Sequence, residues 1–179
     1  NDIKKILTFL NFTFDISDLD TLNERNNKIK TFIQFEDNYL VFHFDEKWIY
    51  KDYIKEYNSI EPSFEEFVNF INVLTKKIPL NVIISSGNIS NPILDKFCNN
   101  LKKYNDQLYF NKCNGQYVYV TKNLNFFDLE TLVKNSSTVI TCHGAVTHLA
   151  SSLNKKIFDI FDKSKKEFYF KWNKHMKNY

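Results

Sequence analysis

The chain has 179 residues, of which 43% are hydrophobic, so it is long enough for one domain with a substantial core. Its formal net charge is +3, and the basic excess is scattered apart from small clusters near Lys155 and Lys163, which is not the concentrated footprint of a nucleic-acid-binding protein. The three cysteines show no C-x-x-C spacing, so neither a thiolate zinc site nor a disulfide framework is indicated, and a reducing cytoplasm fits best. No apolar run approaches the roughly 20 residues that a transmembrane helix needs.

The pattern of apolar residues predicts a domain over residues 38–179, preceded by a lead-in or interdomain linker at residues 1–37. Because the chain begins with Asn1 rather than Met, we expect it to be a piece of a longer protein. Short apolar runs predict strands at residues 39–44, 80–85, 117–121, 138–142 and 156–161. Helical periodicity and capping residues predict helices at residues 64–77, 92–101, 126–134, 145–153 and 166–174. Residues 45–60 are interpreted as a charged loop.

Strands that alternate with amphipathic helices predict an α/β fold, a Rossmann-like doubly wound parallel sheet of about five strands. Right-handed crossovers give the strand order 3-2-1-4-5, which reverses between the first and the fourth strand. Ligands of open α/β sheets bind beyond the carboxyl ends of the strands at such a reversal. The sequence therefore predicts a site between the loop that follows residue 43 and the loop that follows residue 142.

Gly144 stands where the fourth strand ends and the next helix begins. The unpaired N–H groups at the start of a helix attract anions, so we expect this turn to bind phosphate, with a nucleotide-sugar diphosphate as the leading candidate. The candidate donor-binding residues flank this turn or end the neighbouring strands: His43, Lys47, Ser86, Gly87, His143, Gly144, Ala145, Val146, Thr147 and His148. Each of them also has an interpretation as a packing, turn or solvated residue.

Cys142 lies beside two histidines, which suggests either a nucleophile or a metal site. A cysteine that ends a buried strand is usually inert packing, and no nucleophile-elbow sequence surrounds it. A metal site built from Cys142, His143 and His148 lacks a carboxylate or a further ligand at suitable spacing. We therefore expect neither a catalytic thiolate nor a metal, and no cofactor other than the nucleotide-sugar substrate.

The segment His-Gly-Ala-Val-Thr-His-Leu-Ala-Ser-Ser-Leu at residues 143–153, followed by a Lys-Lys-Ile strand, resembles the donor-binding segment of glycosyltransferase family 9, the heptosyltransferase-like enzymes. The usual form in that family is Asp-Ser/Thr-Gly-x-x-His-Leu-Ala-x-Ala-Leu. Aligned on His148, the family's acidic residue falls on His143, its hydroxyl residue on Gly144 and its glycine on Ala145. Lys47 matches a lysine that the family uses for the donor phosphates.

The resemblance implies the carboxyl-terminal, donor-binding half of a GT-B glycosyltransferase. The expected activity is metal-independent, inverting transfer from a nucleotide-sugar to a cell-surface glycan or lipopolysaccharide acceptor. The catalytic base would lie on an N-terminal acceptor domain outside this chain, so the catalytic residues are unknown. The expected location is the cytoplasm, and the resemblance also allows peripheral association with the inner face of the membrane. The alternatives are a non-catalytic Rossmann-like nucleotide-binding module and a plain interaction domain.

Overall fold

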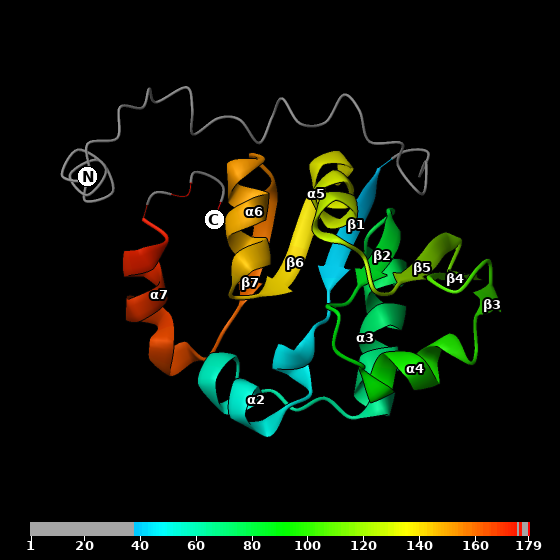
Figure 1. Cartoon of the computed structure of the whole chain (residues 1–179), viewed down its shortest axis with the longest axis horizontal. Helices are drawn as coiled ribbons and strands as arrows, with labels where there is room; N and C mark the ends of the chain where they lie inside the picture. Colours follow the sequence, from blue (N-terminus) through cyan, green and yellow to red (C-terminus); the bar gives the residue numbers. More distant parts are fainter. Residues whose placement is uncertain (1–37, 175, 177–178) are drawn as a thin grey trace. The chain divides into compact units, whose positions relative to one another are not determined.

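Residues 38–174, 176 and 179 are described by the computed structural model of the chain, an α/β structure built on one mostly parallel sheet of seven strands (Figure 1). The interpretation of residues 1–37 as a lead-in or linker lies outside the described residues. The strands are β1 (Tyr39–His43), β2 (Asn81–Ser85), β3 (Lys102–Lys103), β4 (Leu108–Cys113), β5 (Gln116–Thr121), β6 (Thr138–Cys142) and β7 (Lys156–Ile160). The α-helices are α2 (Lys51–Tyr57), α3 (Phe64–Lys77), α4 (Pro92–Cys98), α5 (Phe126–Asn135), α6 (Ala145–Ser152) and α7 (Lys166–Trp172).

The sheet order is β3-β4-β5-β2-β1-β6-β7. The neighbours β5, β2, β1, β6 and β7 run parallel, whereas β3 and β4 pair antiparallel. The prediction of a five-stranded, wholly parallel sheet is therefore wrong in strand count, and the complete order differs from it. The two additional strands lengthen the edge beyond β5, so the order still reverses between β1 and β6, where ligands of α/β sheets bind.

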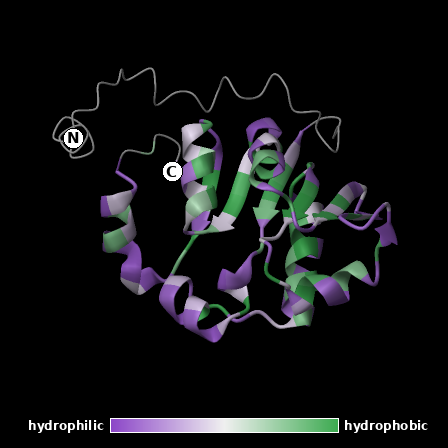
Figure 2. Cartoon of the chain, viewed as in Figure 1, coloured by the Kyte–Doolittle hydropathy of each residue, from purple (hydrophilic) through white to green (hydrophobic). Residues whose placement is uncertain are grey.

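Alternate residues of the central strands bury their side chains on opposite faces of the sheet. Leu40, Phe42 and Phe44 join the core that α3 and α4 cover, whereas Tyr39 and Val41 join the core beneath α5 and α6. Because both faces are covered, the central strands β1, β2 and β6 are buried along nearly their whole length rather than on alternate residues, and most of their residues are apolar (Figure 2). None of the described helices is long and apolar enough to cross a membrane.

Regular structure occurs in two regions to which the sequence assigned no helix or strand. Residues 45–60 hold a 3-10 helix, η3 (Glu46–Trp48), and α2, so the interpretation as a loop is wrong. The Asp45 side chain caps η3 by accepting a hydrogen bond from the Lys47 N–H at 3.1 Å. Residues 108–113 form β4, and the predicted strand at residues 117–121 is confirmed as β5; the two form a hairpin whose turn at Asn114 and Gly115 uses positive φ at both residues.

The carboxyl ends of β1 and β6 lie side by side, because His43 pairs with Thr141 in the parallel register. The loops that follow Phe44 and Cys142 therefore leave the sheet together, as expected from the sequence. A backbone hydrogen bond from Phe44 N to Ser85 O at 2.8 Å extends this edge to β2. The parallel part of the sheet thus brings the loops after β1, β2 and β6 to one edge.

Candidate functional site

Lys47 and Gly144, which belong to different loops, meet at the carboxyl edge of the sheet. A Cβ atom added to Gly144 would lie 3.0 Å from Lys47 Cε and 3.2 Å from Lys47 Nζ. The glycine is extended, with φ near 161°, so its backbone would accept any residue. A side chain at this position would require the end of the Lys47 side chain, which lies against the start of α6, to shift by a few tenths of an ångström.

The first turn of α6 presents backbone donors next to this ammonium group. The Gly144 N–H donates to Thr147 Oγ1 at 3.2 Å. The amides of Ala145, Val146 and Thr147 have no partner within the helix, since the first turn of any helix lacks acceptors for them. Ala145 is exposed, whereas the Val146 and Thr147 side chains are buried, so these two residues contribute their backbones to the edge.

Asp45 holds Lys47 in this position. The Asp45 carboxylate, whose side chain is only 3% exposed, forms an ion pair with the Lys47 ammonium group. Burial would raise the pKa of Asp45, but hydrogen bonding and charge from His43 and Lys47 outweigh burial and lower it. Burial would likewise lower the pKa of Lys47, and the ion pair with Asp45 raises it instead. Both groups are therefore charged at neutral pH.

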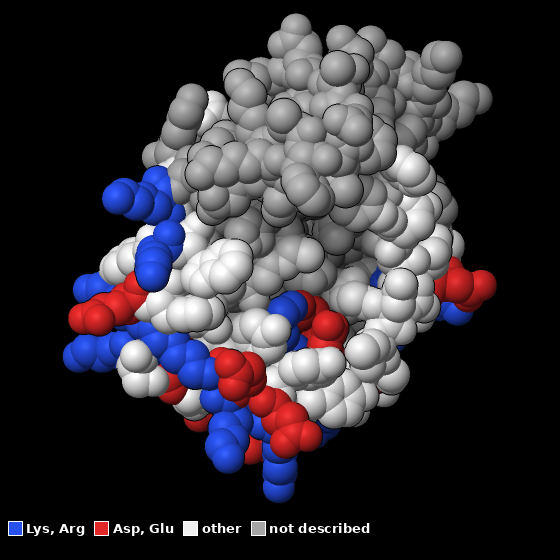
Figure 3. All heavy atoms as spheres, turned by 60° about the vertical axis from the view of Figure 1, so that its left-hand side comes forward, with Lys and Arg blue, Asp and Glu red and all other residues white. Residues whose placement is uncertain are grey.

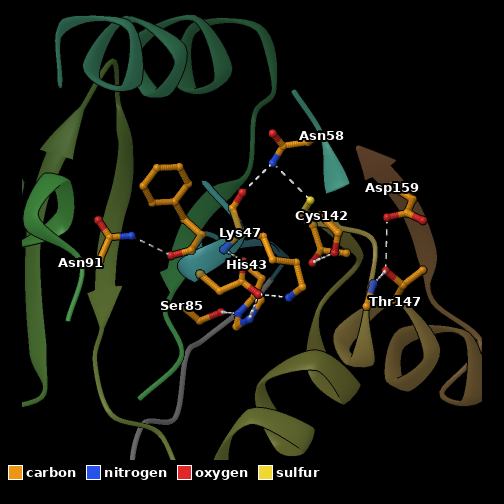
Figure 4. Close-up of polar contacts among 12 residues, drawn as sticks. His43, Lys47, Asn58, Ser85, Asn91, Cys142, Thr147 and Asp159 are labelled. Carbon is orange, nitrogen blue, oxygen red and sulfur yellow. Dashed lines mark hydrogen bonds and ion pairs between the residues drawn. The ribbon is translucent and has the colours of Figure 1, made fainter. Parts of the chain in front are cut away.

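His43 extends the same arrangement into the sheet. Its Nε2 lies 3.5 Å from Asp45 Oδ2, and its Nδ1 lies 3.0 Å from Ser85 Oγ (Figure 4). Each ring nitrogen of His43 therefore contacts one polar neighbour. His43 is 4% exposed, so it supports Asp45 rather than lining an open surface.

The order Ser85–His43–Asp45 has the composition of a hydrolase triad, but its burial argues against that chemistry. The Ser85 side chain is completely buried, so its hydroxyl oxygen has no access to a substrate carbonyl. The charged end of the chain of contacts is the Lys47 ammonium, which lies nearest to the surface. The three residues therefore act as a support for Lys47.

The loop after β2 also lies near the residues that support Lys47. A Cβ atom on Gly87 would lie 3.0 Å from Glu46 Oε2, and Ser86 is buried with its N–H bonded to Thr121 O at 3.3 Å. The two predicted residues of this loop therefore contact η3 and β5, and no described contact joins them to Gly144 or Lys47. Asn91 fixes the same edge, because its amide donates to Phe44 O at 3.2 Å (Figure 4).

His143 points into a buried polar network rather than toward Lys47. Its Nδ1 lies 2.6 Å from Asp159 Oδ2, and its ring lies 4.2 Å from that of Tyr169 on α7. The same Asp159 carboxylate accepts hydrogen bonds from Thr147 Oγ1 at 3.2 Å (Figure 4) and from the Tyr179 hydroxyl at 2.8 Å. His143 is 8% exposed, so the structure gives it a structural position next to the site.

His148 and Cys142, which both lie near the start of α6, differ in solvent exposure. The His148 side chain is exposed on α6, with its ring 5.7 Å from that of His143. Cys142 is 1% exposed, its sulfur accepts a hydrogen bond from Asn58 Nδ2 at 3.3 Å, and burial raises its pKa to about 12. Since a thiolate is the reactive form, Cys142 is inert packing. Among the described residues, no group of three or more His, Cys, Asp or Glu side chains could hold a metal ion.

Three polar residues of this region were not among the predicted site residues: Asp45, Asn58 and Asp159. Asp159 interrupts the apolar run of Ile157, Phe158 and Ile160 in β7, and a carboxylate within such a run is a signal that the sequence offered. Asp45 lies two residues before Lys47 in the same loop. Asn58 reaches both the Lys47 carbonyl, at 2.9 Å, and Cys142 (Figure 4), and nothing in its local sequence marks it.

The site thus combines an ammonium group and a helix start, both held in place by buried carboxylates. Comparison with known proteins identifies no relative of this chain. No protein-family model matches it, and no curated protein gives a significant match to it.

Proposed function

We propose that this domain binds the diphosphate of a nucleotide-sugar between Lys47 and the first turn of α6, as the Rossmann-like donor half of a GT-B glycosyltransferase. The proposal rests on one observation, the position of the Lys47 ammonium against Gly144. The start of a helix carries a partial positive charge, so a cation beside it is unfavourable unless an anion lies between them. Asp45 supplies part of that negative charge, and a diphosphate would supply the rest.

The chemistry of this pair suits the departure of a nucleoside diphosphate. Negative charge accumulates on the leaving phosphate oxygens when the bond to the sugar breaks, and preorganised donors lower the barrier by stabilising that charge. Lys47 would provide a charge-assisted hydrogen bond, and the amides of Ala145, Val146 and Thr147 would provide the helix-start contacts. The acceptor glycan or glycolipid and the base that activates it would be held by an N-terminal acceptor domain.

A second candidate function is nucleotide binding without sugar transfer. It is favoured by His143, which occupies the position of the acidic residue in the related family and is engaged with Asp159 and Tyr169. A domain that has lost this acid would keep the phosphate contacts of Lys47 and the α6 start. The two candidates differ in whether the complete protein transfers sugar, not in whether the domain binds nucleotide.

Calorimetry with ADP, GDP, UDP and CMP, together with sugar-linked forms of each, tests the proposal. We expect weak binding of at least one nucleotide to the wild-type chain, because the proposal assigns the other half of the cleft to an N-terminal acceptor domain. Lys47→Ala should weaken that binding at least tenfold, since one charge-assisted contact contributes on the order of 1.5 to 3 kcal/mol. The absence of heat with every nucleotide would contradict the proposal and favour an interaction domain.

A further inference from the structure

Helix α7 carries large aromatic side chains that the core does not use. Phe168 and Trp172 are 58% and 61% exposed, whereas Tyr169 between them is buried. The rings of Phe168 and Trp172 lie 6.1 Å apart, one turn from each other along the helix, and form what we call the α7 aromatic pair. Adjacent exposed aromatic rings of this size are typical of an interaction surface.

The segment that holds this pair also carries the positive charge of the chain. Residues 163–174 contain five lysines and one glutamate, a net charge of +4 where the whole chain carries +3. Lys165 pairs with Glu56, and the other four lysines have no acidic partner among the described residues. On the face shown in Figure 3, basic side chains gather with acidic ones among them. The lysines of the segment are Lys163, Lys165, Lys166, Lys171 and Lys174.

We propose that α7 docks the protein on an anionic lipid surface. Phenylalanine and tryptophan rings insert at the boundary between headgroups and acyl chains, where apolar contact and a polar indole N–H are both satisfied. Lysines attract phosphate headgroups and lay their aliphatic stems along the apolar boundary. The α7 aromatic pair would enter the boundary, and the surrounding lysines would contact the headgroups.

The charge of the segment favours lipid over other occupants. A second copy of this chain would bring two surfaces of net charge +4 together, which is repulsive. Nucleic acid is also anionic, but its phosphates are bound best by the bidentate guanidinium group, and the segment contains lysines and no arginine. Proteins that bind single-stranded nucleic acid stack successive bases on several aromatic side chains. The α7 aromatic pair on a seven-residue helix offers only a short surface for such stacking, which also disfavours nucleic acid.

The inner side of α7 connects this surface to the candidate site. Tyr169 is 4% exposed and packs on His143, the residue before Gly144. Because a helix with its side chains is about 10 Å across, a bilayer in contact with α7 would lie close to the α6 start. The docking proposal uses only α7 and its charges, so it stands independently of sugar transfer.

Tryptophan fluorescence provides a direct test, because the chain has only two tryptophans and they differ in environment. Trp48 is 5% exposed, so a change in emission on adding vesicles reports on Trp172. We expect a blue shift with vesicles of phosphatidylcholine mixed with phosphatidylglycerol, and none with phosphatidylcholine alone. An unchanged spectrum with both would overturn the proposal.

Vesicle sedimentation of variants tests which residues carry the binding. Lys171→Gln with Lys174→Gln should reduce partitioning on the order of tenfold or more, because each lysine near an anionic surface contributes about 1 kcal/mol. Phe168→Ser should reduce it by a similar factor. The matched controls, Lys76→Gln with Lys77→Gln and Phe126→Ser, remove exposed lysines and an exposed ring elsewhere and should leave partitioning unchanged.

Two results of the experiments with variants would also overturn the proposal. One is equal loss of partitioning in the control variants, which would indicate a non-specific effect of net charge or hydrophobicity. The other is preferential binding of α7 to nucleic acid. It would be seen if a single-stranded oligonucleotide displaced all of the protein from the vesicles. The same oligonucleotide would also have to bind the wild type but not the double variant at Lys171 and Lys174.

Discussion

Lys47→Met separates the role of the ammonium group in anion binding from its role in stability. Methionine keeps most of the length and volume of the lysine stem but removes the charge. The Asp45 carboxylate would then remain in place with one partner lost, keeping the Lys47 backbone N–H at 3.1 Å and His43 at 3.5 Å. The variant should therefore affect both folding stability and binding.

The size of each effect follows from burial. Breaking a fully buried ion pair costs about 3 to 5 kcal/mol. The Lys47 side chain is 15% exposed, and Asp45 keeps two partners, so we expect a loss of about 2 kcal/mol in the free energy of unfolding. For a domain of this size that is roughly 4 to 8 °C in Tm. Nucleotide affinity should fall about tenfold to a hundredfold, for loss of one charge-assisted contact.

The double variant Asp45→Asn with Lys47→Met distinguishes the two effects. The neutral asparagine removes the uncompensated charge, so Tm should recover most of the loss while nucleotide binding stays weak. Lys122→Met is a matched control, because Lys122 pairs with Asp95 outside the candidate site, and it should leave nucleotide binding unchanged. Calorimetry and thermal unfolding measure the two quantities. Full nucleotide affinity in Lys47→Met would refute the assignment of the ammonium group to the phosphates.

Four further outcomes are expected. His148→Ala should change Tm little, since the side chain is exposed, but weaken nucleotide binding in calorimetry; a large drop in Tm with affinity preserved would show a packing role. His143→Ala should cost about 2 to 4 kcal/mol in chemical denaturation, because it leaves a buried carboxylate without its nearest partner. Under native conditions iodoacetamide should label Cys113 and spare Cys142, whose pKa near 12 leaves little thiolate; rapid labelling of Cys142 would contradict its burial. Because the folded-state pKa of Asp45 is lowered, its contribution to stability should be complete above about pH 4 and lost as pH falls through the folded pKa, whereas Asp45→Asn should show a flatter acid limb in pH-dependent unfolding.

The elements that the sequence predicted well are those with strong local signals. Ser63 and Glu66 form the capping box of α3 in the structure, and Asn91 caps α4 directly before Pro92. The apolar runs of β1, β2 and β6 have no competing interpretation, because they are too short for buried helices. Local chemistry alone therefore determines most of the parallel part of the sheet.

The elements that were missed depend on weaker or non-local signals. Strand β4 was missed although Asn114-Gly115, the dipeptide that favours tight hairpin turns, joins it to the predicted strand at residues 117–121, because β4 contains the polar residues Asn111 and Lys112. Helix α2 buries only Ile54 among its seven residues, so its periodicity is faint. Such an element is stabilised by its neighbours, which a single sequence does not display.

The candidate site shows the same division between local and non-local information. Gly144 and Lys47 were both predicted, and their approach follows from the reversal of strand order between β1 and β6. The partners of His143 were not predictable, because Asp159 reaches it across the β6–β7 pairing, in which Thr141 lies opposite Asp159. The contacts of a side chain at a strand end depend on the register with which the neighbouring strand pairs. That register cannot be read from the local sequence pattern.

The position of Asp159 also bears on how an anion would bind beside it. A carboxylate near the start of α6 would repel a phosphate, yet this one is 2% exposed and accepts from His143, Thr147 and the Tyr179 hydroxyl. Three donors directed at one buried carboxylate occupy its oxygens and fix them away from the open edge of the sheet. In glycosyltransferase family 9, which the segment at residues 143–153 resembles, an acid aligns with position 143, whereas here the acid is Asp159 on the neighbouring strand β7 and contacts His143. On the proposed function, the charge that attracts the diphosphate therefore comes from Lys47 and the α6 amides, while His143 and Asp159 keep the turn at Gly144 in place.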